Sequence, residues 1–225
     1  MTNLPALSAP DLAALLASRL CHDIISPVGA IQSGLELLDD MPDDPESMAL
    51  VRSSTKSAVA KLQFARIAYG ASGSSTAQID MGDAKTVAEG LMSFEKASLQ
   101  WTGERAYVPK NIAKLVLNLL VVANASVPRG REVEVTIEQL EPVARFTIAA
   151  RGKPLRVPAK FRELLAGDAT PDSIDAHGIQ PYYALLLARE AGLTVSLEQG
   201  EESVLFRVEP AAQAAEPSLE TDGPR

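Results

Sequence analysis

Residues 20–27 read LCHDIISP, and the pattern around them predicts the architecture of the first part of the chain. This stretch lies inside a longer run whose apolar residues recur at alternating steps of three and four, the spacing of a helix that packs against other helices. These positions are Cys21, Ile24, Val28, Ile31, Leu35 and Leu38. Upstream, Ser8, Pro10 and Asp11 form a capping box, which predicts where this helix begins.

A second helix is predicted after residues 39–45, which are rich in Asp and Pro and indicate a turn. It repeats the alternation at Val51, Thr55, Ala58, Leu62, Ala65 and Tyr69. Two helices joined by a short turn lie antiparallel, so residues 1–70 are predicted to form a helical hairpin. Because two helices alone bury such a seam poorly, we expect a homodimer that completes a four-helix bundle. The alternative is that the hairpin packs onto the second half of its own chain.

The rest of the chain has the pattern of an α+β fold. We expect a linker at residues 71–78, a domain over residues 79–210 and a disordered tail at residues 211–225. Helical patterns cover residues 87–99, 109–127 and 181–191. Strand patterns pair as two hairpins, residues 132–137 with 145–149 and residues 193–198 with 204–208. This order predicts an α/β sandwich, a mixed sheet with helices on one face.

Composition excludes several classes of function. Among 225 residues, 21 Lys and Arg stand against 29 Asp and Glu, a net charge of -8 that argues against binding the phosphate backbone of nucleic acid. No uninterrupted apolar stretch approaches the ~20 residues that span a bilayer. The single cysteine, Cys21, rules out an intramolecular disulfide and is expected to be a small buried hydrophobe. We expect a cytoplasmic protein with no nucleic-acid or membrane partner.

His22 is predicted to face solvent, because it lies about 200° around the helix from the seam residue Ile24. Pro27 has no N–H, so the carbonyl of Asp23 loses its usual helical donor and the helix should kink there. Taken alone, an exposed histidine beside a tolerated kink needs no function. The other histidine, His177, is interpreted as a loop residue, and Trp101 as a core residue.

HDIISP, residues 22–27, resembles the H-box of bacterial histidine kinases, a His-acidic-x-x-polar-Pro signature on the first helix of a dimerising hairpin. The resemblance covers nearly the whole chain except the tail. In that family the histidine is phosphorylated on a ring nitrogen and passes the phosphoryl group to an aspartate of a receiver domain. Ile25 stands where the family usually has a basic residue. Ser26 stands where it usually has Thr or Asn, a position tied to phosphatase activity.

The same resemblance makes residues 79–210 a kinase-like ATP-binding domain whose nucleotide-contacting positions have changed. LNLLVVA at residues 117–123 resembles the N-box, and the family's magnesium-binding asparagine falls on Val122, which has no donor oxygen. The family's adenine-binding aspartate falls on Ala150. A glycine that lets helix N–H groups approach phosphate falls on Gln180, and Pro181 then removes a donor. We expect a domain that kept its shape and lost nucleotide binding.

Together these features predict a histidine phosphotransferase, which relays a phosphoryl group between receiver-domain aspartates without ATP. His22 would accept the group, Asp23 would orient its ring and hold the tautomer, and Arg19 would neutralise charge on the transferring group. We expect no cofactor-binding or metal-binding residues in this chain, since Mg²⁺ is expected from the receiver domain.

The arrangement resembles the histidine phosphotransferases of the alphaproteobacterial cell-cycle phosphorelay. That resemblance implies a donor receiver in a CckA-like hybrid histidine kinase and acceptors in CtrA-like and CpdR-like response regulators. Three other interpretations stay open: a divergent histidine kinase that still binds ATP, a non-catalytic bundle scaffold, and a receiver phosphatase that uses Ser26 to place a water.

Overall fold

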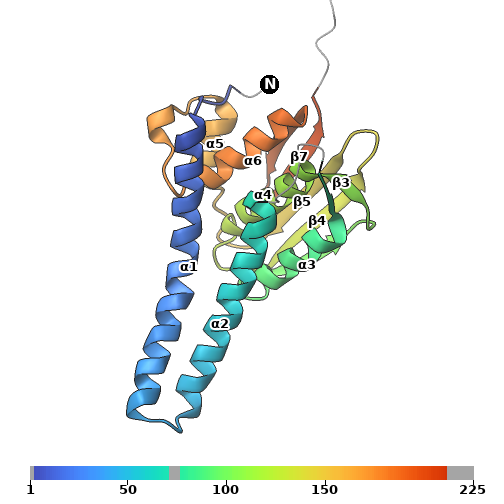
Figure 1. Ribbon diagram of the computed structural model, residues 1–225. Helices are drawn as coiled ribbons and strands as arrows, with labels where there is room; N and C mark the ends of the chain where they lie inside the picture. The colour runs from blue at the N-terminus through green and yellow to red at the C-terminus, as the bar shows by residue number, and fades with distance from the viewer. Residues whose placement is uncertain (1–2, 71–76, 212–225) are drawn as a thin grey trace, which may run out of the picture.

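The computed structural model describes residues 3–70 and 77–211. Two helices, α1 (Ala9–Asp40) and α2 (Pro45–Ala65), form an antiparallel hairpin whose closed end projects away from the remaining chain (Figure 1). A π-helical turn, η1 (Arg66–Gly70), continues α2 toward the second part. Most of the predicted linker, residues 71–76, and nearly all of the predicted tail, residues 212–225, lie outside the described residues.

Both hairpin helices begin where the sequence predicts. The Ser8 side chain accepts a hydrogen bond from the Asp11 N–H at 3.2 Å, and a proline occupies the first turn of α1. The Asp44 side chain caps α2 in the same way, accepting from the Ser47 N–H at 2.9 Å. The hydrogen bonds from Ser47 lower the pKa of Asp44, so its carboxylate is held ionised at the helix N-terminus.

The second part is an α+β domain, as predicted. Its helices are α3 (Met81–Met92), α4 (Lys110–Ala125), α5 (Ala159–Ala166), the 3₁₀ turn η2 (Pro171–Ser173) and α6 (Ile179–Glu190). Its strands are β1 (Gln78–Asp80), β2 (Ser98–Thr102), β3 (Tyr107–Pro109), β4 (Glu132–Gln139), β5 (Arg145–Arg151), β6 (Leu193–Gln199) and β7 (Ser203–Pro210). Five strands form a mixed sheet in the order β2-β4-β5-β7-β6, in which β2 is parallel to β4. A small β1–β3 ladder stands apart from it.

The two predicted strand hairpins are confirmed, because β4 pairs with β5 and β6 with β7, both antiparallel. The predicted helix over residues 87–99 is wrong at its end. Helix α3 stops at Met92, and the last predicted helical residues enter strand β2 at Ser98. Within β2, Leu99 and Trp101 are half-buried and their neighbours exposed, which is the alternation of an edge strand. Trp101, expected in the core, packs against it from this edge.

Helices α3, α4 and α6 cover one face of the sheet (Figure 1). The core is densest along α4, whose residues 112–120 are all buried, because the sheet covers one side while α6 and η1 cover the other. Two polar side chains of α4 reach the end of the hairpin. Lys114 donates to the Tyr69 carbonyl at 3.2 Å, and Asn118 donates to the Ala68 carbonyl at 3.1 Å. These bonds satisfy carbonyls at a helix C-terminus and fix the hairpin to the domain.

The predicted hairpin seam divides into two rows. The row of Ile24, Ile31 and Leu38 is half-buried, on the side of α1 nearest α2, where Gly34 lets the helices approach closely. The row of Cys21, Val28 and Leu35 is exposed. Helix α2 divides in the same way, with Val51, Ala58 and Ala65 covered, and Thr55 and Leu62 exposed. Each helix of the hairpin therefore covers only one row of its partner, whereas the sequence pattern predicted a single continuous seam.

Cys21, expected to be a small buried hydrophobe, lies on the row that is exposed in the single chain. The apolar character of α1 also raises the question of whether it could span a membrane. Helix α1 is long and apolar enough to cross a bilayer by length and composition, with a mean hydropathy of 1.2 over its most apolar 18 residues. It packs along α2 and carries Arg19, His22 and Asp23 in its middle, as a bundle helix does.

Candidate active site around His22

His22 lies in the middle of α1 with 58% of its side chain exposed, as predicted. Its Nδ1 atom is 3.4 Å from the Asp23 Oδ1 atom. When Nδ1 carries the ring proton toward this carboxylate, the lone pair of the neutral imidazole is on Nε2. The structure thus brings together the predicted nucleophile and the residue predicted to select its tautomer.

Arg19 is bound to the other oxygen of the same carboxylate. Its Nε atom donates to Asp23 Oδ2 at 2.9 Å, and the two side chains are 20% and 28% exposed. Asp23 is therefore held between a guanidinium on one side and the imidazole of His22 on the other. This geometry makes Arg19 a residue that positions Asp23, while its predicted action on the transferring group stays a prediction.

Pro27 lies inside α1 and is buried, and the helix runs through it. The Asp23 carbonyl, which cannot accept from residue 27, accepts from the Lys61 ammonium at 3.1 Å. Lys61 comes from α2, so the predicted loss of a helical donor is compensated across the hairpin. The main chain next to His22 is therefore tied to both helices. Sequence reasoning predicted the orphaned carbonyl and missed the lysine.

His177 lies directly beside His22. The two ring centroids are 5.0 Å apart and the ring planes meet at 80°, an edge-to-face contact. His177 is in the loop before α6, and that loop is fixed by Asp175, whose Oδ1 accepts from the N–H groups of His177 at 3.0 Å and Gly178 at 2.7 Å. These bonds, with that from Gly178 the larger cause, lower the pKa of Asp175. The sequence placed His177 correctly in a loop but gave no signal of this contact.

Gln180, which replaces a glycine of the kinase pattern, is buried between three elements. Its side chain accepts from the Tyr69 hydroxyl at 2.8 Å and donates to Asn118 Oδ1 at 3.1 Å. Burial raises the pKa of Tyr69, so its hydroxyl stays protonated to donate this bond. The other two altered positions, Val122 and Ala150, are buried and apolar. At the three positions where the family pattern has nucleotide contacts, one side chain is hydrogen-bonded within the protein and the other two are apolar.

A small cavity of about 100 Å³ lies where the hairpin meets the domain. It is lined by polar and charged side chains from both parts, among them Arg19, Asp23, Lys61, Glu95, Asn124 and Gln180. Pockets for small organic ligands usually measure ~300–1,000 Å³, so this one has room for a few waters. Among residues 3–70 and 77–211, His, Cys, Asp and Glu side chains form no group of three that could hold a metal ion.

The structure thus places an exposed histidine on a helical hairpin that is joined to an α+β domain. Residues 81–203 match the family model of the histidine phosphotransferase C-terminal domain. The chain belongs to this family.

Relatives that match most of the chain agree. Over 203 residues the chain is 52% identical to protein phosphotransferase ChpT of Brucella abortus (strain 2308), a match that covers 90% of this chain and 97% of that protein. A bacterial phosphotransferase solved at 1.7 Å superposes with a TM-score of 0.87 at 51% identity, covering 92% of this chain and all of the other. The predicted function, phosphotransfer within a two-component phosphorelay, is confirmed at this level, and the kinase, scaffold and phosphatase interpretations are not favoured.

Proposed function

We propose that His22 is the residue that carries the phosphoryl group, taking it from one receiver aspartate and giving it to another. The observation that supports this most directly is the exposed imidazole with the Asp23 carboxylate at Nδ1. A buried structural histidine would be enclosed by apolar side chains, whereas this ring is open to a partner domain. Its contact with Asp23 favours the tautomer that nucleophilic attack by Nε2 requires.

In the forward step, the Nε2 lone pair of His22 forms the N–P bond as the P–O bond to the donor aspartate breaks, and the aspartate carboxylate leaves with the electron pair. The ring keeps its Nδ1 proton and becomes a phosphoimidazolium, whose positive charge faces the Asp23 carboxylate. In the reverse sense, an acceptor aspartate attacks phosphorus and Nε2 recovers its lone pair. Neither direction requires a net proton transfer. Positioning and charge neutralisation carry most of such a reaction.

We propose that the receiver domain supplies Mg²⁺ and that this chain transfers phosphate without binding ATP. The Asp23 carboxylate, the nearest candidate ligand to His22, is already paired with Arg19. The apolar Val122 and Ala150 and the hydrogen-bonded Gln180 support the proposal for ATP. Calorimetric titration with ATP and Mg²⁺ checks it, and micromolar binding would restore the kinase interpretation.

The proposed assembly is a cytoplasmic homodimer. The exposed row of Cys21, Val28 and Leu35, with Leu62 on α2, offers an apolar stripe that a second hairpin can cover to complete a four-helix bundle. Replacing Leu35, which is 50% exposed, with Glu should convert the dimer to a monomer in light scattering. A Leu35→Glu protein that keeps the wild-type mass would contradict this interface.

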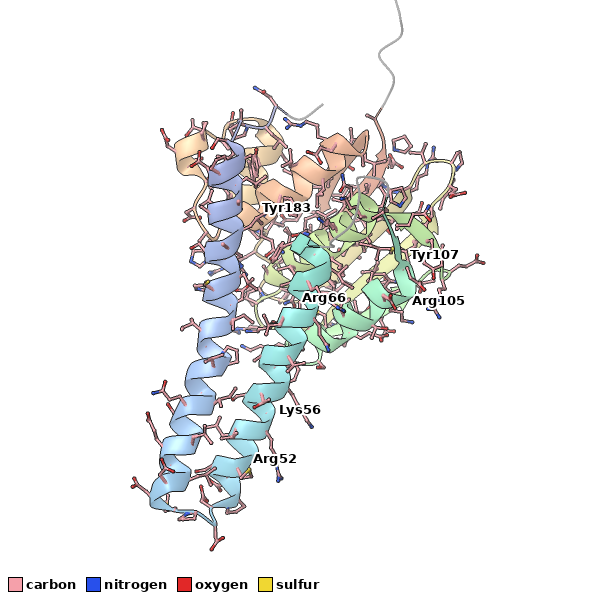
Figure 2. All side chains as sticks on the ribbon, viewed as in Figure 1. Arg52, Lys56, Arg66, Arg105, Tyr107 and Tyr183 are labelled. Carbon is pink, nitrogen blue, oxygen red and sulfur yellow. The ribbon has the colours of Figure 1, made fainter. Side chains whose placement is uncertain are left out.

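The proposed partners are receiver domains: the donor in a CckA-like hybrid kinase, and the acceptors in CtrA-like and CpdR-like response regulators. Relatedness to protein phosphotransferase ChpT supports this set. Basic side chains suit the docking of an anionic aspartyl phosphate. Arg52 and Lys56 project from α2 on the side away from α1, with Arg66 higher on the same helical rod (Figure 2).

The test of the proposed function mixes the purified chain with a receiver domain carrying ³²P on its aspartate. Label should appear on the wild-type chain, be stable to base and be lost in acid, as a phosphoramidate is. The His22→Gln protein should take no label, while the matched Gln32→Ala protein on the same exposed helix should behave as wild type. Label on His22→Gln would overturn the assignment.

A further inference from the structure

We propose that His177 neutralises the phosphoryl group carried by His22, so that the second domain contributes a residue to the active site. The proposal rests on the proposed role of His22. The contact that carries it is the edge-to-face pair of rings with centroids 5.0 Å apart. The phosphoryl oxygens on Nε2 would extend from one of these rings, and the imidazole of the other is close enough to donate an N–H to them.

The position of His177 is built into the loop. Asp175 accepts hydrogen bonds from the main-chain N–H groups of His177 and Gly178. On the other side, the Lys160 side chain packs against Gly178, so closely that an added Cβ there would lie 3.0 Å from it. The main chain of His177 is thus held from two sides, and its side chain stays exposed beside His22. Because the main chain is already fixed here, only the side chain of His177 is left to be ordered when phosphate arrives.

The charged groups around the ring pair leave this role to His177. On α1, Arg19 is bound to the Asp23 carboxylate. On α2, the Lys61 ammonium is bound to the Asp23 carbonyl. On α5, Lys160 is paired with Glu163. The loop itself adds the Asp175 carboxylate. Each of these lysines and arginines has a partner already, while the phosphoryl group adds negative charge next to two carboxylates.

Histidine is the side chain that gains a proton between pH 5 and 8, and a neighbouring anion favours the protonated form. Attaching a phosphoryl dianion to His22 should therefore draw a proton onto His177. The resulting imidazolium stabilises phospho-His22 relative to the phosphorylated receiver. This stabilisation is fully present at low pH, where the imidazolium forms readily, and is lost as pH rises and the ring becomes neutral.

The experiment measures the equilibrium constant for transfer between a receiver aspartate and His22 at pH 6.0 and pH 8.5, in the wild type, His177→Ala and His177→Lys proteins. The equilibrium constant depends only on the separate reactants and products. A role of His177 in docking the receiver would therefore change the rates of transfer and leave the equilibrium constant unchanged. The effect of receiver and His22 titration cancels when wild type is compared with a variant at the same pH.

We expect His177→Ala to lower the constant about fivefold at pH 6.0, as a partly exposed pair with a phosphate would, and by less than twofold at pH 8.5. His177→Lys, with a fixed charge, should match wild type at pH 6.0 and exceed it at pH 8.5. An equal loss at both pH values, or none, would overturn the proposal while leaving His22 in its role. Failure of the wild type to take label on His22 would overturn the proposed function and this inference with it.

Discussion

The ammonium group of Lys61 donates a hydrogen bond to the main-chain carbonyl of Asp23, at 3.1 Å. In an uninterrupted helix that carbonyl would accept from the N–H of residue 27, which is a proline here. A side chain from α2 thus supplies the donor that α1 lacks, next to His22. The consequence is that the backbone beneath the phosphoryl acceptor is anchored to both helices of the hairpin.

This relationship predicts a double-mutant cycle. Lys61→Met should lower the free energy of unfolding by about 1–2 kcal/mol, because the Asp23 carbonyl loses its donor. In a Pro27→Ala background the restored N–H satisfies that carbonyl, so Lys61→Met should cost much less. Urea unfolding measures all four proteins, with Lys56→Met on the exposed side of α2 as the control. Equal costs of Lys61→Met in both backgrounds would show that the hydrogen bond is unimportant.

Asp23 should control the rate of transfer. Asp23→Asn keeps the size of the side chain and removes the charge that faces Nδ1 of His22. We expect a loss of roughly tenfold or more in the rate of label transfer from a phosphorylated receiver, since the phosphoimidazolium loses its counter-charge. Asp39→Asn, on the exposed end of the same helix, is the matched control. Wild-type rates in Asp23→Asn would remove this carboxylate from the mechanism.

Gln180 should act as a structural link between the hairpin and the domain. Gln180→Ala removes one hydrogen-bond partner from the buried Asn118 amide and one from the Tyr69 hydroxyl. This loss should lower the free energy of unfolding by about 1–3 kcal/mol. Gln63→Ala, an exposed glutamine on α2, should cost almost nothing. Chemical denaturation compares the two. If Gln180→Ala were as stable as Gln63→Ala, the hydrogen-bonded link would carry no weight.

Asp175 should make stability depend on acid pH. Hydrogen bonds from Gly178 and His177 hold the pKa of its folded-state carboxyl below the usual 3.8. The ionised carboxylate therefore stabilises the fold above about that pH, and the contribution is lost as pH falls through the lower folded value. The difference in melting temperature between wild type and Asp175→Asn should shrink between pH 6 and pH 3. The exposed Asp172→Asn should show no such trend; a constant Asp175→Asn difference would contradict the assignment.

Much of this site follows from local patterns. The heptad spacing predicts that His22 lies on an exposed face, and the missing N–H of Pro27 predicts that the Asp23 carbonyl lacks its helical donor. Residues 87–99 were misread because periodicity alone did not reveal that the apolar Leu99 and Trp101 alternate along a strand. Cys21 is exposed in the single chain because a seam has two rows, and spacing does not say which row faces the intrachain partner.

The contacts that could not be predicted are those made across the tertiary fold. His177 meets His22, and Gln180 meets Tyr69, through the packing of a distant loop and helix against the hairpin. A single sequence carries no periodic signal for such pairs. The sequence shows Gln180 where the kinase pattern has a glycine, but the hydrogen-bond partners of Gln180 depend on how α4, α6 and η1 meet.

A relay between two receiver domains is the sharpest test of whether His22 carries the phosphoryl group. A donor receiver labelled with ³²P on its aspartate is mixed with this chain and a second, unlabelled receiver, and label on each protein is followed with time. We predict that label passes transiently through the wild-type chain and accumulates on the second receiver, and that His22→Gln stops the flow while its circular dichroism stays that of wild type. Label that reaches the second receiver in the presence of His22→Gln would rule out His22 as the carrier, and release of label from the wild type as inorganic phosphate would rule out a relay.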